Sequence, residues 1–149
     1  MSVFEHSEAN LYIVDASTMA PMTSRPFPAL VGKGTGRLDT HFDDYYKYRA
    51  TTCIINTGNL LCETINYLTG ASISSKSVAD TSSGIYDPPL CSTPENKFYI
   101  VATKLKFYFF DPDNVTPNAT KDLVLLAGFD IQDMNSYYGS NEIFVLTKN

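Results

Sequence analysis

The stretch Lys97–Phe110, KFYIVATKLKFYFF, is a long apolar and aromatic run that contains no obvious catalytic group. Read with a period of two, one face of this run carries Tyr99, Val101, Thr103, Leu105, Phe107 and Phe109. The other face carries Phe98, Ile100, Ala102, Lys104, Lys106, Tyr108 and Phe110. Such alternation is typical of a strand with one buried and one partly wetted face. We therefore predict one long strand here, and a chain whose strongest signal concerns the building of a sheet.

Further strands are predicted on both sides of this run. The apolar and β-branched segments expected to form them are Asn10–Asp15, Asp44–Asn56, Asp122–Ile131 and Glu142–Lys148. In the second of these, alternation places Ala50 and Thr52 on one face and Thr51 and Cys53 on the other. The short links between the three C-terminal strands favour an antiparallel meander.

One segment, residues 60–69, is predicted to be a helix. Leu61, Ile65 and Leu68 recur at i, i+4 and i+7, which is the spacing of one helix face. Asn59 can act as the N-cap, and Gly70 can end the helix in a left-handed conformation. The apolar stripe is narrow, which favours a helix packed on one face of a sheet.

Two long segments, residues 16–43 and 70–96, are predicted to be irregular arms or loops. The first contains Pro21, Pro26 and Pro28, which oppose both helix and sheet, and then alternating glycines. The second is rich in serine and contains adjacent prolines. The first segment also carries the apolar residues Met19, Met22, Phe27, Leu30 and Val31. We predict that they dock onto a surface of this chain or of a neighbour.

The composition supports a single mainly β or α+β domain covering residues 1–149. Apolar residues make up 44% of the chain, charged residues only 18%, and tryptophan is absent. At this length a domain buries enough surface to fold without a metal or a disulfide. We expect an antiparallel sheet or small sandwich with one packed helix.

The charge distribution argues against several classes of partner. The net charge is −5, and basic residues form no tail or cluster. Nucleic-acid binding requires a concentrated positive surface, so we expect no direct nucleic-acid partner. We also expect no membrane partner, because an acidic surface suits anionic lipids poorly. The first residues lack the pattern of a signal peptide, which predicts a protein made in a cytoplasm.

Residues able to carry chemistry are few. Cys53, Cys62 and Cys91 follow no metal-ligand spacing and are expected to be small buried thiols. His41, Asp43 and Asp44 form the one cluster that a small enzyme could use. Two ligands on one strand face do not make a metal site, and no nucleophile accompanies the histidine. We therefore predict no metal, no cofactor and no catalytic residue.

Tyrosines form two groups that could contact a partner. These are Tyr45, Tyr46 and Tyr48 in one group and Tyr137 and Tyr138 in the other. Tyrosine offers a large contact area at low entropic cost and a polar tip. Such groups suit a surface that binds protein or sugar, although ordinary sheet packing also uses them.

These observations favour a non-catalytic structural protein that assembles with copies of itself or with neighbouring proteins in a large complex. Long arms on a β core and a surface low in charge are typical of such subunits. In composition the chain resembles small virion proteins of tailed phages, such as decoration, tail or connector subunits, which would imply incorporation in a virion. The alternatives are a carbohydrate- or receptor-binding module that uses the tyrosines, and a small enzyme that uses His41, Asp43 and Asp44.

Overall fold

The fold is built from antiparallel strands. The computed structural model describes residues 10–33, 48–81, 85–86, 88–93, 99–104, 106–111, 119–122, 130–136 and 142–148. Within these ranges every regular element is a strand, and the strands form two four-stranded sheets and two hairpins. The mainly β, antiparallel architecture predicted from the sequence is confirmed.

The two four-stranded sheets are the inner layers of the structure. The first sheet has the order β5 (Ser72–Ala79), β4 (Asn59–Asn66), β3 (Arg49–Asn56) and β6 (Ile85–Tyr86). The second sheet has the order β10 (Ala119–Asp122), β9 (Lys106–Phe110), β8 (Tyr99–Ala102) and β7 (Leu90–Ser92). Their facing side chains form one apolar cluster, which includes Ile55 and Leu60 from the first sheet and Tyr99, Val101 and Phe110 from the second.

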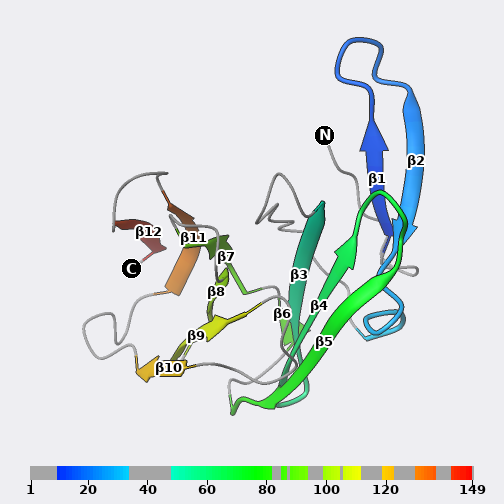
Figure 1. Cartoon of the computed structure of the whole chain (residues 1–149). Coiled ribbons are helices and arrows are strands. Elements are labelled where there is room, and N and C mark those ends of the chain that lie inside the picture. The colour runs from blue at the N-terminus through cyan, green and yellow to red at the C-terminus, as the bar shows by residue number, and fades with distance from the viewer. Residues whose placement is uncertain are drawn as a thin grey trace.

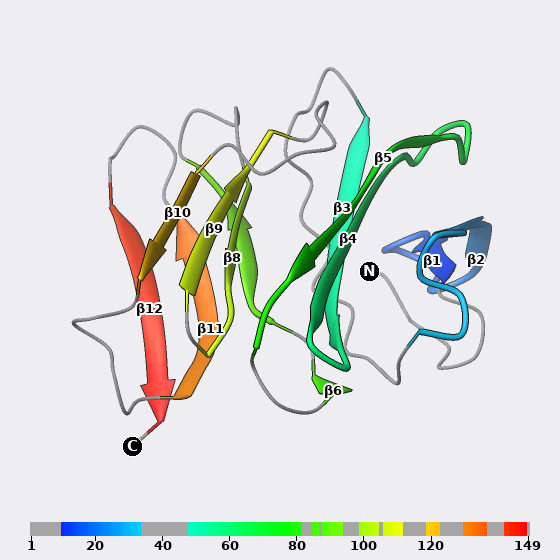
Figure 2. The same cartoon turned by 90° about the horizontal axis from the view of Figure 1, so that it is seen from below.

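A two-stranded hairpin covers the outer face of each inner sheet (Figure 2). Strands β1 (Asn10–Val14) and β2 (Pro21–Pro26) lie on the side of the first sheet, and Leu11 packs there with Ala50 and Ile65. Strands β11 (Asp130–Ser136) and β12 (Ile143–Lys148) lie on the side of the second sheet. The order of layers is therefore hairpin, sheet, sheet, hairpin.

The predicted helix at residues 60–69 is wrong, because Asn59–Asn66 is strand β4. β4 lies in the middle of the first sheet, between β3 and β5, and both of its faces are covered. Leu60 faces the second sheet, whereas Leu61 and Ile65 face the β1–β2 hairpin. A strand that is buried on both faces has apolar residues on both, so the alternation of apolar and polar residues that marks a strand is lost. Apolar residues then also occur by chance at helical spacing.

The residues interpreted as helix caps are turn residues instead. Asn59 pairs with Asn56 across the two-residue turn Thr57-Gly58. Both central residues have positive φ, 45° and 83°, which is typical of a tight hairpin turn whose twist matches the flanking strands. At the other end of β4, Gly70 donates its amide to the carbonyl of Asn66 at 2.7 Å. Both ends of the segment thus reverse the chain.

The long strand predicted over Lys97–Phe110 is two strands, β8 and β9, joined by a tight turn. The Thr103 amide donates to the Lys106 carbonyl at 2.9 Å, and the Lys106 amide donates to the Thr103 hydroxyl at 3.1 Å. The turn changes which residues share a face. Tyr99 pairs with Phe110 and faces the first sheet, whereas Phe109 faces the β11–β12 hairpin. The prediction that Phe107 and Phe109 share a face with Tyr99 is therefore wrong.

The two segments predicted to be irregular contain strands. In residues 16–43, Pro21 and Pro26 are the first and last residues of β2, positions where a missing amide is tolerated. In residues 70–96, Ser72–Ala79 forms β5, and β6 and β7 follow it. β5 does alternate, with Ser74 and Lys76 buried, but its alternating residues are polar on both faces. Hydropathy therefore gives no strand signal there.

The cysteines are buried as predicted, but two of them are not free thiols. Cys53 and Cys62 are directly paired on β3 and β4 and form a disulfide within the first sheet, on the face that packs against the second sheet. Cys91 on β7 is a buried free thiol. The prediction of three thiols rested on sequence spacing, which does not show that the β3–β4 register places these two residues opposite each other.

Candidate functional site

The β1–β2 hairpin extends beyond the rest of the molecule (Figure 1). We call Asn10–Pro26, which comprises both strands and their connecting turn, the hairpin arm. Its strands pair from Asn10 opposite Pro26 to Val14 opposite Pro21. The first segment predicted to be an irregular arm is thus, over its described N-terminal part, an ordered hairpin.

Asp15 organises the turn of the hairpin arm. Its Oδ1 accepts hydrogen bonds from the amides of Ser17 and Thr18, at 2.8 and 2.9 Å, and from the Ser17 hydroxyl at 2.6 Å. The hydrogen bond from the Ser17 hydroxyl is the largest of the effects that lower the Asp15 pKa to about 2. The Met19 amide donates to the Asp15 carbonyl at 2.8 Å, and Met19 has a φ of 57°. The turn is therefore a defined structure rather than a loose loop.

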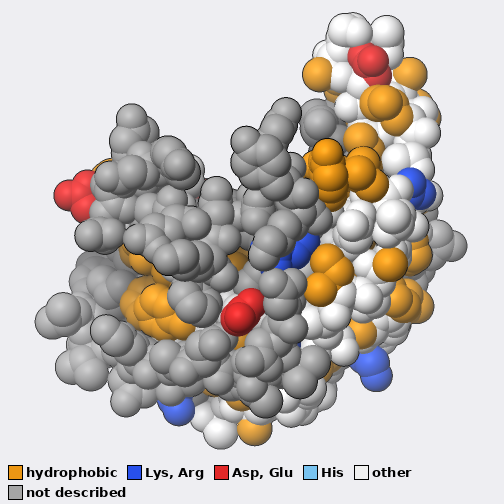
Figure 3. All heavy atoms as spheres, viewed as in Figure 1, with side chains coloured by type: hydrophobic (Ala, Val, Ile, Leu, Met, Phe, Trp, Pro, Cys, Tyr) orange, Lys and Arg blue, Asp and Glu red, His pale blue; other side chains and the backbone are white. Residues whose placement is uncertain are grey.

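The turn and the start of β2 expose two large apolar side chains. Met19 is 55% exposed and Met22 is 67% exposed. We call these two residues the arm tip. Hydrophobic side chains line the arm in the space-filling view (Figure 3). Methionine is flexible and polarisable, so it adapts to an irregular partner surface.

Arg25 holds the hairpin arm to the body of the protein. Its guanidinium donates from Nε to the carbonyl of Tyr67 at 3.0 Å and from Nη2 to the carbonyl of Leu68, both in the β4–β5 turn. Its Nη1 also donates to the Thr23 hydroxyl at 3.1 Å. The two bonds to the β4–β5 turn connect residues more than 40 positions apart in the sequence, and they tie the end of β2 to the first sheet.

The base of the hairpin arm is seated in an apolar cluster. This cluster contains Leu11 of β1 and two residues of the segment after β2, Phe27 and Leu30. All three are buried against Ile54 and Ile65 of the first sheet. Of the five apolar residues predicted to dock in the first segment, Phe27 and Leu30 therefore dock on this chain itself and are not available to a partner. Met19, Met22 and Val31 are exposed and remain as candidate contacts.

Glu63 adds a polar contact under the same segment. It lies on the arm-facing side of β4, is buried, and accepts a hydrogen bond from the Ala29 amide at 2.8 Å. Its other oxygen accepts from the Ser72 hydroxyl at 2.8 Å. Burial raises the pKa of Glu63, and the two hydrogen bonds oppose that rise. The carboxylate thus connects the chain beyond β2 to both β4 and β5.

A second exposed apolar surface lies on β12. Ile143 and Val145 pack toward the second sheet, whereas Phe144 and Leu146 point outward and are 59% and 63% exposed. We call the surface of these two outward residues the β12 face. An open groove of about 310 Å³ runs beside them, lined also by Met134 and Asp133. The sequence analysis did not identify this surface; its signal is the run of four apolar residues Ile143–Leu146, which exceeds what one buried face needs.

The arm tip and the β12 face lie at opposite ends of the stack of layers (Figures 1 and 2). The hairpin arm covers the first sheet and β12 covers the second, with both inner sheets between them. One molecule therefore cannot bring its own two apolar surfaces together.

The predicted tyrosine groups lie mostly outside the described residues. Tyr45, Tyr46, Tyr137 and Tyr138 are in that part of the chain. Tyr48 is exposed, and its ring meets that of Tyr67 edge to face at 5.7 Å between centroids. Tyr48 thus borders the β4–β5 turn to which Arg25 is attached.

The residues considered for catalysis, His41, Asp43 and Asp44, also lie outside the described residues. Across the ranges that the structure describes, no three His, Cys, Asp or Glu side chains gather in a way that could hold a metal ion. The same ranges contain no helix of the length and apolarity needed to span a membrane.

Comparison with known proteins adds no family. A scan of the sequence against protein-family models finds no match, and a search of curated proteins finds none either.

Proposed function

We propose that this protein is a non-catalytic structural subunit that assembles with copies of itself in a large complex. The observation that carries the proposal is the pair of exposed apolar surfaces at opposite ends of the molecule, the arm tip and the β12 face. Isolated exposed apolar residues are common, but pairs on a projecting hairpin and on an outer strand suit protein contacts.

The construction of the hairpin arm supports this proposal. Its turn is organised by Asp15 and its base by Arg25 and the Leu11 cluster. An arm that is already ordered loses little conformational entropy on binding, which favours association. The ordered arm holds Met19 and Met22 in position for a partner, and both side chains are exposed to solvent in the free subunit.

The positions of the two surfaces favour a head-to-tail arrangement. The arm tip and the β12 face are different surfaces at opposite ends of the molecule. When the arm tip of one copy contacts the β12 face of the next, the pair still has one free arm tip and one free β12 face. Repetition of such a contact gives a ring when the rotation closes and a filament or tube when it does not. The compositional resemblance to small virion proteins of tailed phages directs the proposal to a virion component.

The first test is the mass of the full chain by light scattering over a hundredfold range of concentration, with electron microscopy of the same samples. We expect a fixed oligomer, a ring or a tube. The double variant Met19→Ser/Met22→Ser should raise the dissociation constant at least about tenfold, because burying one methionine contributes about 1.5–3 kcal/mol and 1.4 kcal/mol is a factor of ten. Ile73→Ser, at an exposed apolar residue of β5, is the matched control.

Mixing two variants tests the arrangement itself. The arm variant and Phe144→Ser/Leu146→Ser each lack one surface, so each alone should be monomeric. An equimolar mixture retains one intact contact and should give a dimer and nothing larger. A monomeric native protein at all concentrations would contradict the proposal, and so would assembly that survives both double variants.

A further inference from the structure

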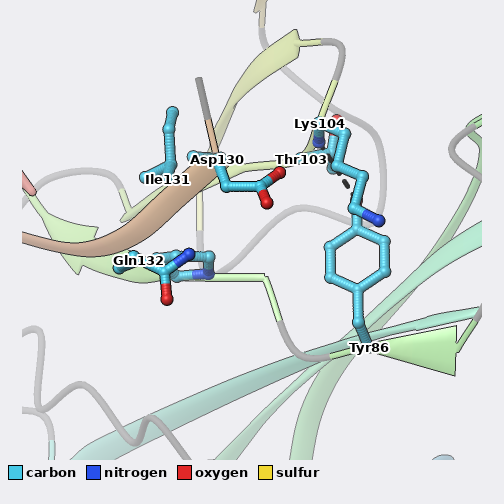
Figure 4. Close-up of a pocket in the computed structure, with 8 residues that line it drawn as sticks. Tyr86, Thr103, Lys104, Asp130, Ile131 and Gln132 are labelled. Carbon is cyan, nitrogen blue, oxygen red and sulfur yellow. Dashed lines mark hydrogen bonds between the residues drawn. The ribbon is translucent and has the colours of Figure 1, made fainter. Parts of the chain in front are cut away.

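A small pocket lies where the two inner sheets and the β11–β12 hairpin meet (Figure 4). Its volume is about 190 Å³, below the roughly 300–1,000 Å³ of sites for drug-sized ligands, so it suits a small molecule. The residues that line it are Tyr86, Pro89, Ala102, Thr103, Lys104, Asp130, Ile131 and Gln132. They come from β6, from one end of the β7–β8 pair, where Pro89 lies opposite Ala102, and from the start of β11.

Lys104 is held at the wall of the pocket by Tyr86. The Lys104 amide donates to the Tyr86 hydroxyl at 3.0 Å, and the Lys104 ammonium lies over the Tyr86 ring, 4.9 Å from its centroid. An ammonium at this distance is attracted by the ring, which favours this position at the pocket wall although Lys104 is exposed.

Asp130 supplies the opposite charge from the other side. Its carboxylate points toward the Thr103–Lys104 segment, and Gln132 lies two residues further along β11 (Figure 4). Among the described residues, neither side chain has a hydrogen bond or an ion pair. Lys104 and Asp130 also form no ion pair with each other there; both line the pocket and both are exposed.

The arrangement discriminates between classes of small ligand. A simple anion would be repelled by Asp130, and a simple cation would be repelled by Lys104. A neutral sugar would use an open aromatic face, but the Lys104 ammonium already lies over the Tyr86 ring. A small zwitterion satisfies both charges at once, with its carboxylate on Lys104 and its ammonium on Asp130.

We propose that this pocket binds a free amino acid, through Lys104 for the α-carboxylate and Asp130 for the α-ammonium, with Gln132 as a further polar contact. The hydrogen bond from the Lys104 amide to the Tyr86 hydroxyl positions Lys104 at the pocket, and β11 positions Asp130. The site is independent of the two apolar surfaces that carry the assembly proposal.

Equilibrium dialysis of the full chain with labelled L-alanine tests this site in any oligomeric state. We expect saturable binding of one molecule per chain. Competition separates the ligand classes: L-alaninamide lacks the carboxylate, N-acetyl-L-alanine lacks the ammonium, and glucose lacks both. Each should compete at least about tenfold more weakly than unlabelled alanine, because each loses a hydrogen bond to a charged group.

Variants locate the binding. Lys104→Met and Asp130→Asn should each weaken binding of alanine at least about tenfold. Lys148→Met and Asp133→Asn make the same chemical changes outside the pocket and should leave it unchanged. The absence of saturable binding, competition by glucose as strong as that by alanine, or equal binding by all four variants would each overturn the proposal. None of these outcomes bears on assembly.

Discussion

The hydroxyl of Tyr108 in β9 donates a hydrogen bond of 2.8 Å to the carboxylate of Asp80, the residue that follows β5. Because β5 and β9 belong to different inner sheets, this bond joins the two layers. The Thr103 hydroxyl donates to the same oxygen at 2.9 Å, and the Asp80 amide donates to the Gly58 carbonyl at 2.8 Å. Asp80 is buried, and a buried carboxylate depends on such donors.

Tyr108→Phe should therefore lower the free energy of unfolding by about 1–3 kcal/mol, since it removes a donor from a buried charged acceptor while keeping the ring in the core. Urea unfolding measures this loss. Tyr12→Phe is the matched control on the hairpin arm, where the hydroxyl has no hydrogen-bond partner in the described chain, and it should change stability by less than about 0.5 kcal/mol. Equal losses in the two variants would show that the Tyr108–Asp80 bond contributes nothing.

Gly70 should be the more sensitive of two glycines with similar backbones. Gly70 has a φ of +80° and Gly32 a φ of +69°, so alanine is strained at both, by about 1–2 kcal/mol. At Gly70 the new Cβ would also lie 3.0 Å from Cδ of Arg25, whereas nothing lies within 4 Å at Gly32. We expect Gly70→Ala to destabilise the protein more than Gly32→Ala in thermal unfolding. In an Arg25→Ala background the difference should disappear; if it persists, Arg25 is not its cause.

Asp15 should titrate far below an ordinary aspartate. Its pKa is lowered from 3.8 to about 2, mainly by the hydrogen bond from the Ser17 hydroxyl and then by the amides of Thr18 and Ser17. The turn is therefore stabilised by the ionised carboxylate above pH 3.8, and this contribution is lost as the pH falls through about 2. Carboxyl chemical shifts measured by NMR should give a midpoint near 2 in the native chain and a higher midpoint in Ser17→Ala. A native midpoint near 3.8 would contradict the turn structure.

The sequence predicts strands where alternation or a run of β-branched residues marks them, whether one face is exposed, as in β12, or nearly every residue is buried, as in β3. β1, β3 and β12 fall within predicted strands. β4 was mistaken for a helix because the hairpin arm covers the face that would otherwise be polar. That covering is a contact between distant segments, and no local pattern encodes it.

The candidate site shows the same limit. Met19 and Met22 are candidate contact residues from the sequence because apolar side chains are unusual in a segment rich in proline, and both are exposed in the structure. The contact that orients them, Arg25 on the carbonyls of Tyr67 and Leu68, has no sequence signal, because it depends on where the β4–β5 turn lies. Lys104 and Asp130 likewise meet at one pocket only after β11 has packed beside the second sheet.

Glu63 should make the stability of the protein depend on pH in the opposite sense to Asp15. Burial raises its pKa above 4.5, so the folded state holds the proton more tightly than the unfolded state does. This contribution to stability is fully present below pH 4.5 and is lost as the pH rises through the folded pKa. Glu63→Gln keeps an acceptor for the Ala29 amide and removes the titration.

We therefore expect the stability of Glu63→Gln relative to the native chain to increase from pH 4.5 toward pH 7, by at most the 1.4 kcal/mol per pH unit that one proton allows. Urea unfolding at several pH values gives this difference directly. Ser72→Ala removes a hydrogen bond that lowers the Glu63 pKa, so it should move the loss of stability to a higher pH. Parallel pH profiles for Glu63→Gln and the native chain would mean that Glu63 titrates alike in the folded and unfolded states, and that its burial beneath the segment after β2 is not as described.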